Sequence, residues 1–232
     1  MALSVKSVFP NDPIAQDMAT AATRGDVATL QQLKARGADV KVRGQRSLTL
    51  PHLALHAPNP AALVWLVQQG ADPVSALENG ATVPHYALSK KDSEGKPTAA
   101  WLEPLLKLGV SPNLIGDEGQ YTLLVGAAIF ENLPAARALK QAGANMNLMP
   151  DPLKGTAIHL ALTRRNLDMA ADLADLGVDP RIGKRMGDAT MNAAQQYCKF
   201  LGGRLIGPNR QMAFSRMEKS FERWGLQMPC GF

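Results

Sequence analysis

The sequence predicts an all-α solenoid built from stacked helix pairs, on three observations. Aromatic residues make up only 5% of the 232 residues, and alanine and leucine, which favour helices over strands, dominate the apolar 46%. A glycine followed by a small apolar residue and a polar residue recurs with spacings of 33, 39, 34 and 34, at Gly37, Gly70, Gly109, Gly143 and Gly177. Threonines recur in the same register, at Thr49, Thr82, Thr122, Thr156 and Thr190. Two series in one register indicate an internal repeat of about 33 residues.

The segments that follow three of these threonines resemble the ankyrin repeat. They read TLPHLA at 49–54, TVPHYA at 82–87 and TAIHLA at 156–161. The family pattern is roughly G-x-T-P-L-H-x-A, a helix, a short turn, a second helix with a leucine pair, and then G-A-D-x-N. The chain departs from it in placing proline one position late in the first two segments, and Val125 stands where histidine is usual. The resemblance implies an ankyrin-repeat solenoid with short β-hairpin-like loops that project beside a concave groove.

About six repeats are expected in one domain spanning 12–232. A helix pair with a single apolar face cannot bury that face alone, so neighbouring repeats must stack. Each glycine of the motif is expected to end a second helix, because a positive φ is commonly needed there. The predicted boundaries are 12–44, 45–77, 78–117, 118–151, 152–185 and a C-terminal cap at 186–232.

Three of these repeats carry a distinctive feature. In the first, Asp12 and Pro13 suit the N-cap and first residue of a helix, and 21–26 suits the turn between its helices. In the third, a charged insertion at 91–96 is expected to form a loop between the two helices. In the last, one face of a charged helix is apolar and should cover the exposed core, with Phe214, Met217, Phe221 and Trp224.

Charge is distributed unevenly along the sequence. The net charge is +5, yet 181–232 holds nine basic and three acidic residues, so the whole excess lies near the C-terminus. This basic segment is open to two interpretations, an acidic partner or a solvated face. Nucleic acid is not the expected partner, because no aromatic-rich basic motif accompanies the charge.

The sequence does not predict an enzyme, a cofactor or a metal site. No G-x-S-x-G, H-E-x-x-H, P-loop or G-x-G-x-x-G motif is present. His52, His85 and His159 occupy one position per repeat, where a histidine is expected to stabilise the stack. His52 and His56 have a zinc-compatible spacing, but no nearby Cys, Asp or Glu completes a site. No apolar stretch is long enough to span a membrane.

The two cysteines, Cys198 and Cys230, both lie near the C-terminus. Free thiols are the simpler interpretation. The alternative is a disulfide that ties down the C-terminal segment, which would indicate an oxidising compartment.

Partner binding is expected on the loops and in the groove, where long, aromatic or apolar side chains stand at positions that solvent alone does not favour. On the loops these residues are Arg43, Arg46, Ile115, Tyr121, Met149 and Arg185. On the groove they are His56, Tyr86, Lys90, Phe130 and Arg164. The predicted function is therefore a protein-binding module with no small-molecule substrate.

Both ends of the sequence show a second, more specific resemblance. The segment VFPNDP at 8–13 and the segment RWGL at 223–226 are similar to those of bacterial ankyrin proteins that serve as immunity partners of type VI secretion lipase effectors. The resemblance implies a cognate phospholipase as partner, inhibition by steric cover of its active site, and a periplasmic location. The first residues lack the apolar core of a secretory signal, so the location depends on this resemblance alone. The alternative is a scaffold for another protein target, which predicts a cytoplasmic location.

Overall fold

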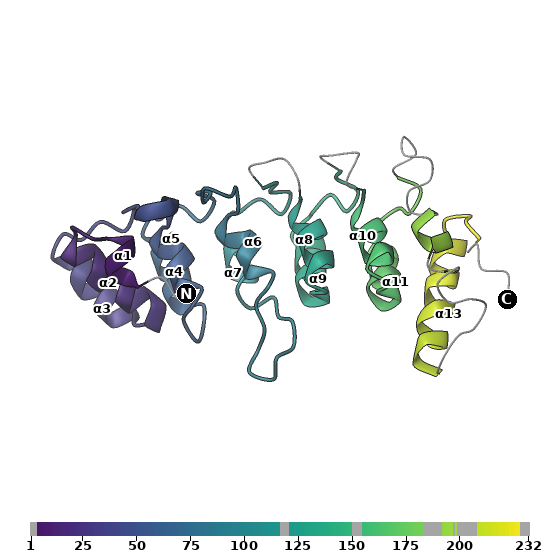
Figure 1. The fold of residues 1–232 in the computed structure, drawn as a ribbon, viewed down its shortest axis with the longest axis horizontal. Coiled ribbons are helices and arrows are strands. Elements are labelled where there is room, and N and C mark those ends of the chain that lie inside the picture. The colour runs from purple at the N-terminus through teal and green to yellow at the C-terminus, as the bar shows by residue number, and fades with distance from the viewer. Residues whose placement is uncertain are drawn as a thin grey trace. The chain divides into compact units, whose positions relative to one another are not determined.

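The computed structural model describes residues 4–116, 121–149, 155–182, 192–196, 198 and 208–227. The regular elements of these residues are helices, together with three isolated antiparallel bridges. The all-α prediction is confirmed. The protein forms two compact units, whose helices are labelled in Figure 1. The first holds residues up to Lys90 with 98–111 and 116, and the second holds 91–97, 112–115 and the described residues from 121 onward.

The first unit contains three helix pairs preceded by a short helix. A single turn, α1, comes first, and α2 then packs against both α3 and α4. Fully buried aliphatic side chains fill the space between these layers, including Met18, Leu30, Leu50, Leu63 and Leu66. The elements are α1 Val5–Val8, α2 Pro13–Arg24, α3 Val27–Ala35, η1 Gln45–Ser47, α4 Leu50–Ala54, α5 Ala61–Gln68, α6 Val83–Ala87 and α7 Glu103–Lys107.

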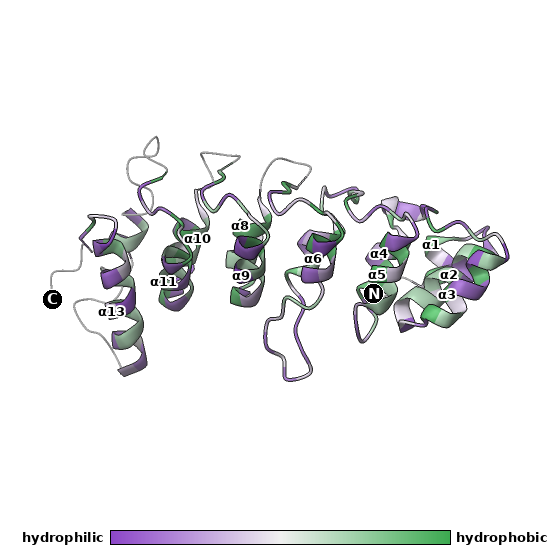
Figure 2. Ribbon diagram, turned by 180° about the vertical axis from the view of Figure 1, so that it is seen from behind, coloured by the Kyte–Doolittle hydropathy of each residue, from purple (hydrophilic) through white to green (hydrophobic). Residues whose placement is uncertain are grey.

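The second unit repeats the same arrangement. Helix α8 packs against α9 and α10, and α11 packs against α10 and α13. These helices carry hydrophobic and hydrophilic residues together, as an amphipathic element packed on one face requires (Figure 2). The elements are α8 Leu123–Ile129, α9 Leu133–Gln141, α10 Ala157–Thr163, α11 Leu167–Asp175 and α13 Pro208–Glu222.

The repeating glycines end the second helices as predicted. All five adopt a left-handed backbone, with φ between 82° at Gly143 and 95° at Gly70 and Gly177. A residue with a Cβ atom is strained there, so the glycine spacing reports the helix ends directly.

The four repeating threonines that the structure describes begin the first helices in two different ways; Thr190 lies outside the described residues. Thr122 and Thr156 cap them by accepting from the backbone N–H groups of Val125 and His159, at 3.1 and 3.3 Å. Where proline is the second helical residue, the hydroxyl bonds to an imidazole instead: Thr49 to Nδ1 of His52 at 2.8 Å. Thr82 bonds to His85 in the same way at 2.9 Å.

The loops between repeats carry short antiparallel bridges, as the resemblance implied. Arg43 pairs with Thr49, and Ile115 pairs with Thr122. The insertion in the third repeat also forms a hairpin, closed by a bridge between Lys91 and Pro97. Its tight turn is held by Asp92, whose carboxylate accepts from the backbone N–H groups of Glu94 and Lys96 at 2.9 Å.

Helix α13 completes the second unit through both apolar and ionic contacts. Phe214, Met217 and Phe221 are buried. On its polar side Arg216 reaches Asp172 of α11 at 2.6 Å, and Ser220 donates to Asp175 at 2.8 Å. Three residues of the predicted apolar face therefore pack, whereas the fourth, Trp224, lies beyond the end of the helix and is half-buried.

Cys198 is disulfide-bonded, so the free-thiol interpretation is wrong for this residue. The other cysteine, Cys230, lies outside the described residues.

Candidate functional site

A concavity of about 700 Å³ lies in the first unit, where helices α4 and α6 end beside two loops. It brings together four of the residues expected to bind a partner, Arg46, His56, Tyr86 and Lys90. Its remaining lining was not predicted to bind a partner, because His52 was expected to stabilise the stack and the other residues stand outside the repeat motif: Leu48, His52, Leu55, Leu77, Glu78, Asn79 and Ser89. Leu48, Leu55, Leu77 and the Tyr86 ring supply apolar surface to this lining, and Arg46, Lys90 and Glu78 supply charged groups.

Tyr86 is the large hydrophobic side chain that this concavity exposes, with 37% of its surface accessible. Its hydroxyl accepts a hydrogen bond from Nδ2 of Asn79 at 3.2 Å. Its ring meets the imidazole of His52 edge-on, with centroids 6.3 Å apart. The ring is therefore held by contacts with Asn79 and His52, while more than a third of the side chain stays accessible to solvent.

Arg46 lies at the tip of the first loop in a strained turn. Arg46 and Ser47 both have positive φ, 57° and 58°, and the N–H of Leu48 donates to the carbonyl of Gln45 at 3.2 Å. Two successive residues in this region form the type I′ geometry that usually requires Asn-Gly. Non-glycine residues in this conformation cost about 1 kcal/mol or more each, a strain that clusters at functional sites.

Lys90 extends along the wall and is anchored at its tip. Its Nζ donates to the carbonyl of Leu55 and lies 5.1 Å from the centroid of the buried Trp101 ring. Burial lowers the pKa of Lys90. Among the described residues, no carboxylate forms an ion pair with it.

His52 forms part of the floor and is only 4% exposed. Burial lowers its pKa to about 4, and the nearby Arg43 lowers it too; the backbone of Ala81 and the charge of Asp72 act in the opposite direction. Nδ1 is occupied by Thr49, whereas Nε2 makes no hydrogen bond of good geometry. The imidazole is thus neutral near pH 7, consistent with a structural role.

The zinc alternative finds no support in this geometry. Helix α4 ends at Ala54, so His56 lies in the following turn and not one helical turn from His52 on the same helix. Within the described ranges, no group of three or more His, Cys, Asp and Glu side chains could hold a metal ion.

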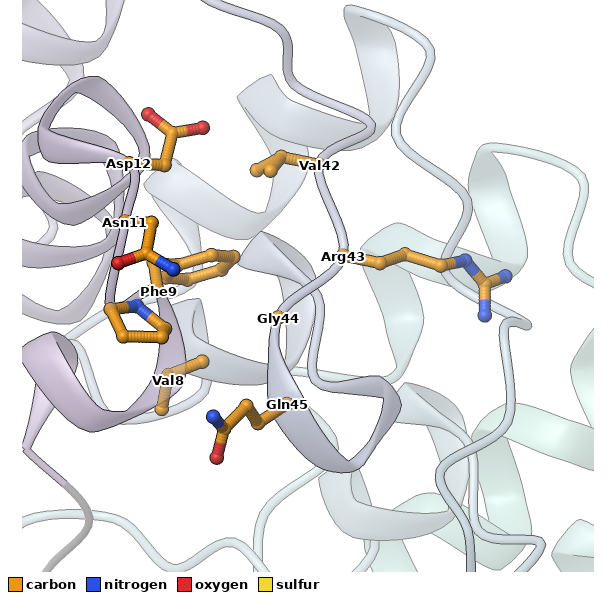
Figure 3. A pocket seen from close by; sticks show the side chains of 9 residues that line it. Val8, Phe9, Asn11, Asp12, Val42, Arg43, Gly44 and Gln45 are labelled. Atoms are coloured by element: carbon orange, nitrogen blue, oxygen red, sulfur yellow. The ribbon is translucent and has the colours of Figure 1, made fainter.

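A second, smaller cleft of about 410 Å³ lies between the N-terminal segment and the first loop (Figure 3). Val8 and Phe9 are buried against Gly44, where a Cβ atom would lie 2.8 Å from the Val8 carbonyl oxygen and 2.9 Å from the Phe9 ring. Arg43 borders this cleft but its side chain points away from it (Figure 3), and its Nη2 donates to Ser75 at 2.7 Å. The N-terminal segment therefore supports the loop that carries Arg46.

The remaining predicted residues that the structure describes lie in the second unit. Phe130 is 46% exposed at the end of α8, and Nη1 of Arg164 donates to the neighbouring Ile129 carbonyl at 3.5 Å. Ile115, Tyr121 and Met149 are half-buried. Arg185 lies outside the described residues.

The basic C-terminal segment is partly neutralised within the protein. Arg181 pairs with Asp179 at 2.8 Å and stacks over Trp224, and Arg216 and Arg223 pair with acidic residues of α11. This geometry reduces the charge available to an acidic partner. No helix in the described parts of the sequence is long and apolar enough to cross a membrane.

Comparison with solved structures identifies the fold. The ankyrin repeat domain of human ASB11 matches 94% of this chain and 86% of its own, with a TM-score of 0.66 and 20% sequence identity. Comparisons with family models and with curated proteins return no match. The fold is thus an all-α ankyrin-repeat solenoid, and the predicted fold class is confirmed.

Proposed function

We propose that this protein of ankyrin-repeat fold is a non-catalytic protein-binding module, and that its partner docks in the concavity of the first unit. The observation that carries the proposal is that a tyrosine and an arginine line the same concavity. Tyr86 is exposed and held by Asn79 and His52, and Arg46 lies in a strained turn. Tyrosine and arginine are the side chains that most often dominate protein interfaces. Apolar side chains beside charged ones resemble the apolar core and polar surroundings of a protein interface.

Within this class, we propose that the partner is a cognate antibacterial phospholipase and that binding inhibits it. The support is the similarity of 8–13 and 223–226 to immunity proteins of type VI secretion lipase effectors. Inhibition requires only that the bound module cover the entrance to the active site or hold its lid closed. The module itself turns over no substrate.

Co-expression with a lipase encoded by the adjacent gene tests both levels of the proposal. We expect a one-to-one complex and loss of lipase activity when the module is in excess. A lipase that stays fully active within that complex contradicts inhibition and favours the scaffold alternative. If no protein partner of any kind binds, the module proposal fails.

Variants locate the binding surface. Tyr86→Ala and Arg46→Ala are expected to weaken the complex, since both residues line the concavity. The matched control is Arg36→Ala, because Arg36 is also exposed in the first unit but does not line the concavity. Equal affinity of all three variants and the wild type would place the partner elsewhere.

A further inference from the structure

We infer that the concavity of the first unit recognises a carboxylate: the docked segment presents an Asp or Glu side chain, or a free C-terminal carboxylate, beside an apolar side chain. This inference rests on the proposed function and specifies the chemistry of the partner. Three observations support it: the charged side chains that line the concavity, the contacts and backbone geometry that position those side chains, and the apolar residues that line the same concavity.

Positive groups outnumber negative groups on this surface. Arg46 and Lys90 are cations, and His56 adds an exposed imidazole. Glu78 is the one carboxylate in the lining, and it stands exposed on the loop before α6. The excess charge of the concavity is therefore positive, although the net basic excess of the sequence comes from 181–232.

Lys90 is the cation with most to gain from a counter-ion. It is half-buried, and burial of a charge without an opposite charge is unfavourable. The ammonium has three donors, of which one reaches the Leu55 carbonyl, and the Trp101 face supplies weak cation–π attraction. A carboxylate from a partner would add an ion pair in surroundings where water screens it less.

Arg46 is placed by a costly backbone conformation. The turn puts the guanidinium of Arg46 at its tip. This guanidinium makes no ion pair with any carboxylate of the described residues. The contrast within this molecule is clear, because Arg181, Arg216 and Arg223 all pair with internal carboxylates. A guanidinium with a free planar edge favours bidentate binding of a carboxylate.

The surface between the cations is apolar. Leu48, Leu55 and Leu77 line it together with the Tyr86 ring. A bare anion would leave this surface in water, whereas an anion carried on an aliphatic or aromatic group would cover it. The occupant we infer therefore combines the two features.

Fragment binding to the full-length protein tests the inference without any protein partner. The probes are 3-phenylpropionate, 3-phenylpropanol and 3-phenylpropylamine, which share one carbon skeleton and differ in charge. Binding is followed by NMR titration of the Trp101 indole N–H and the Tyr86 ring. We expect the carboxylate to bind at least about tenfold more tightly than the alcohol, the amine not to bind, and the preference to weaken with salt.

Two variants and a control assign that preference to its residues. Arg46→Gln is a surface change that leaves the core intact, and Lys90→Met keeps the alkyl stem while removing the charge. Each is expected to reduce the carboxylate preference at least about threefold, whereas Arg36→Gln leaves it unchanged. Equal binding of the alcohol, or a preference that survives both variants, overturns the inference.

The two proposals fail separately. Loss of carboxylate selectivity with an intact lipase complex overturns only the chemistry of the docked segment. A selective concavity in a molecule that binds no protein overturns the proposed function instead.

Discussion

His52 and Tyr86 meet edge-on, with their ring centroids 6.3 Å apart and their planes at 79°. His52 is buried in α4 and Tyr86 is exposed on α6, so this contact links a buried residue of one repeat to the proposed binding surface of the next. The buried histidine therefore contacts the aromatic ring that we expect to bind a partner.

Truncation of Tyr86 is expected to damage binding far more than folding. Tyr86→Ala should weaken the partner complex by about 2 kcal/mol, roughly 30-fold in Kd, because an interface aromatic is lost. Tyr86→Phe keeps the ring and loses only the bond from Asn79, so it should cost less than about 1 kcal/mol. Calorimetric titration of both variants with the lipase measures this, and equal losses would show that the ring itself contributes nothing.

The turn at the tip of the first loop should become more stable when its strain is released. Ser47→Gly is expected to raise the free energy of unfolding by about 0.5–1 kcal/mol and to leave binding unchanged, because glycine adopts positive φ freely. Arg46→Gly should stabilise the fold similarly but weaken binding. Urea unfolding and a binding titration on both variants separate strain from function; destabilisation by both would contradict the strained geometry.

Gly44 should not tolerate a side chain. Gly44→Ala brings a Cβ atom within 2.8 Å of the Val8 carbonyl oxygen and 2.9 Å of the Phe9 ring, so we expect a loss of about 1–3 kcal/mol. Limited proteolysis should then cut the N-terminal segment faster. The change in a Val8→Ala background should be smaller, since the Cβ atom also meets a methyl group of Val8, and strict additivity would refute the contact.

His52 should make the first unit sensitive to mildly acidic conditions. Its pKa falls from the ordinary 6.5 to about 4 in the folded protein. Between these two values, His52 is protonated in the unfolded state but stays neutral in the folded state. Stability is fully present above pH 6.5 and is lost as pH falls toward 4, by at most about 3 kcal/mol. Urea unfolding at pH 7.5, 6 and 5 should show this slope, and His52→Gln should flatten it.

The docking of α13 should depend on the carboxylates of α11 at lower pH. Burial raises the pKa of Asp175. The hydrogen bonds from Ser220 and Arg223, together with the charges of Arg223 and Arg216, lower this pKa by more than burial raises it, so the pKa is below its ordinary value. Its contribution is therefore present above about pH 4 and lost below it. Trp224 fluorescence in a Trp65→Phe, Trp101→Phe background should report detachment below pH 4.

A matched charge change tests the same ion pairs at neutral pH. Arg216→Ala should promote detachment of α13, whereas Lys219→Ala should not, because Lys219 pairs with no described carboxylate. Because these groups are partly exposed, we expect a loss of only about 1 kcal/mol, which decreases in high salt. A signal identical in both variants would contradict the contribution of Arg216.

The sequence by itself determined the repeat and the helix ends. The glycine series lies at positive φ, and the four described threonines of the second series directly precede the first helices, because both features depend on local backbone geometry that a residue type encodes. Three residues of the apolar face of α13, Phe214, Met217 and Phe221, followed from their helical spacing alone.

Only the tertiary structure decided which candidate residues act together. Arg43 and Arg46 look equivalent in the sequence, yet one donates to Ser75 and the other stands on a strained tip above the concavity. Lys90 became a half-buried cation because Leu55 and Trp101 come from other parts of the sequence. Charge pairing and burial depend on neighbours distant in sequence, and the stacking of repeats brings those neighbours together.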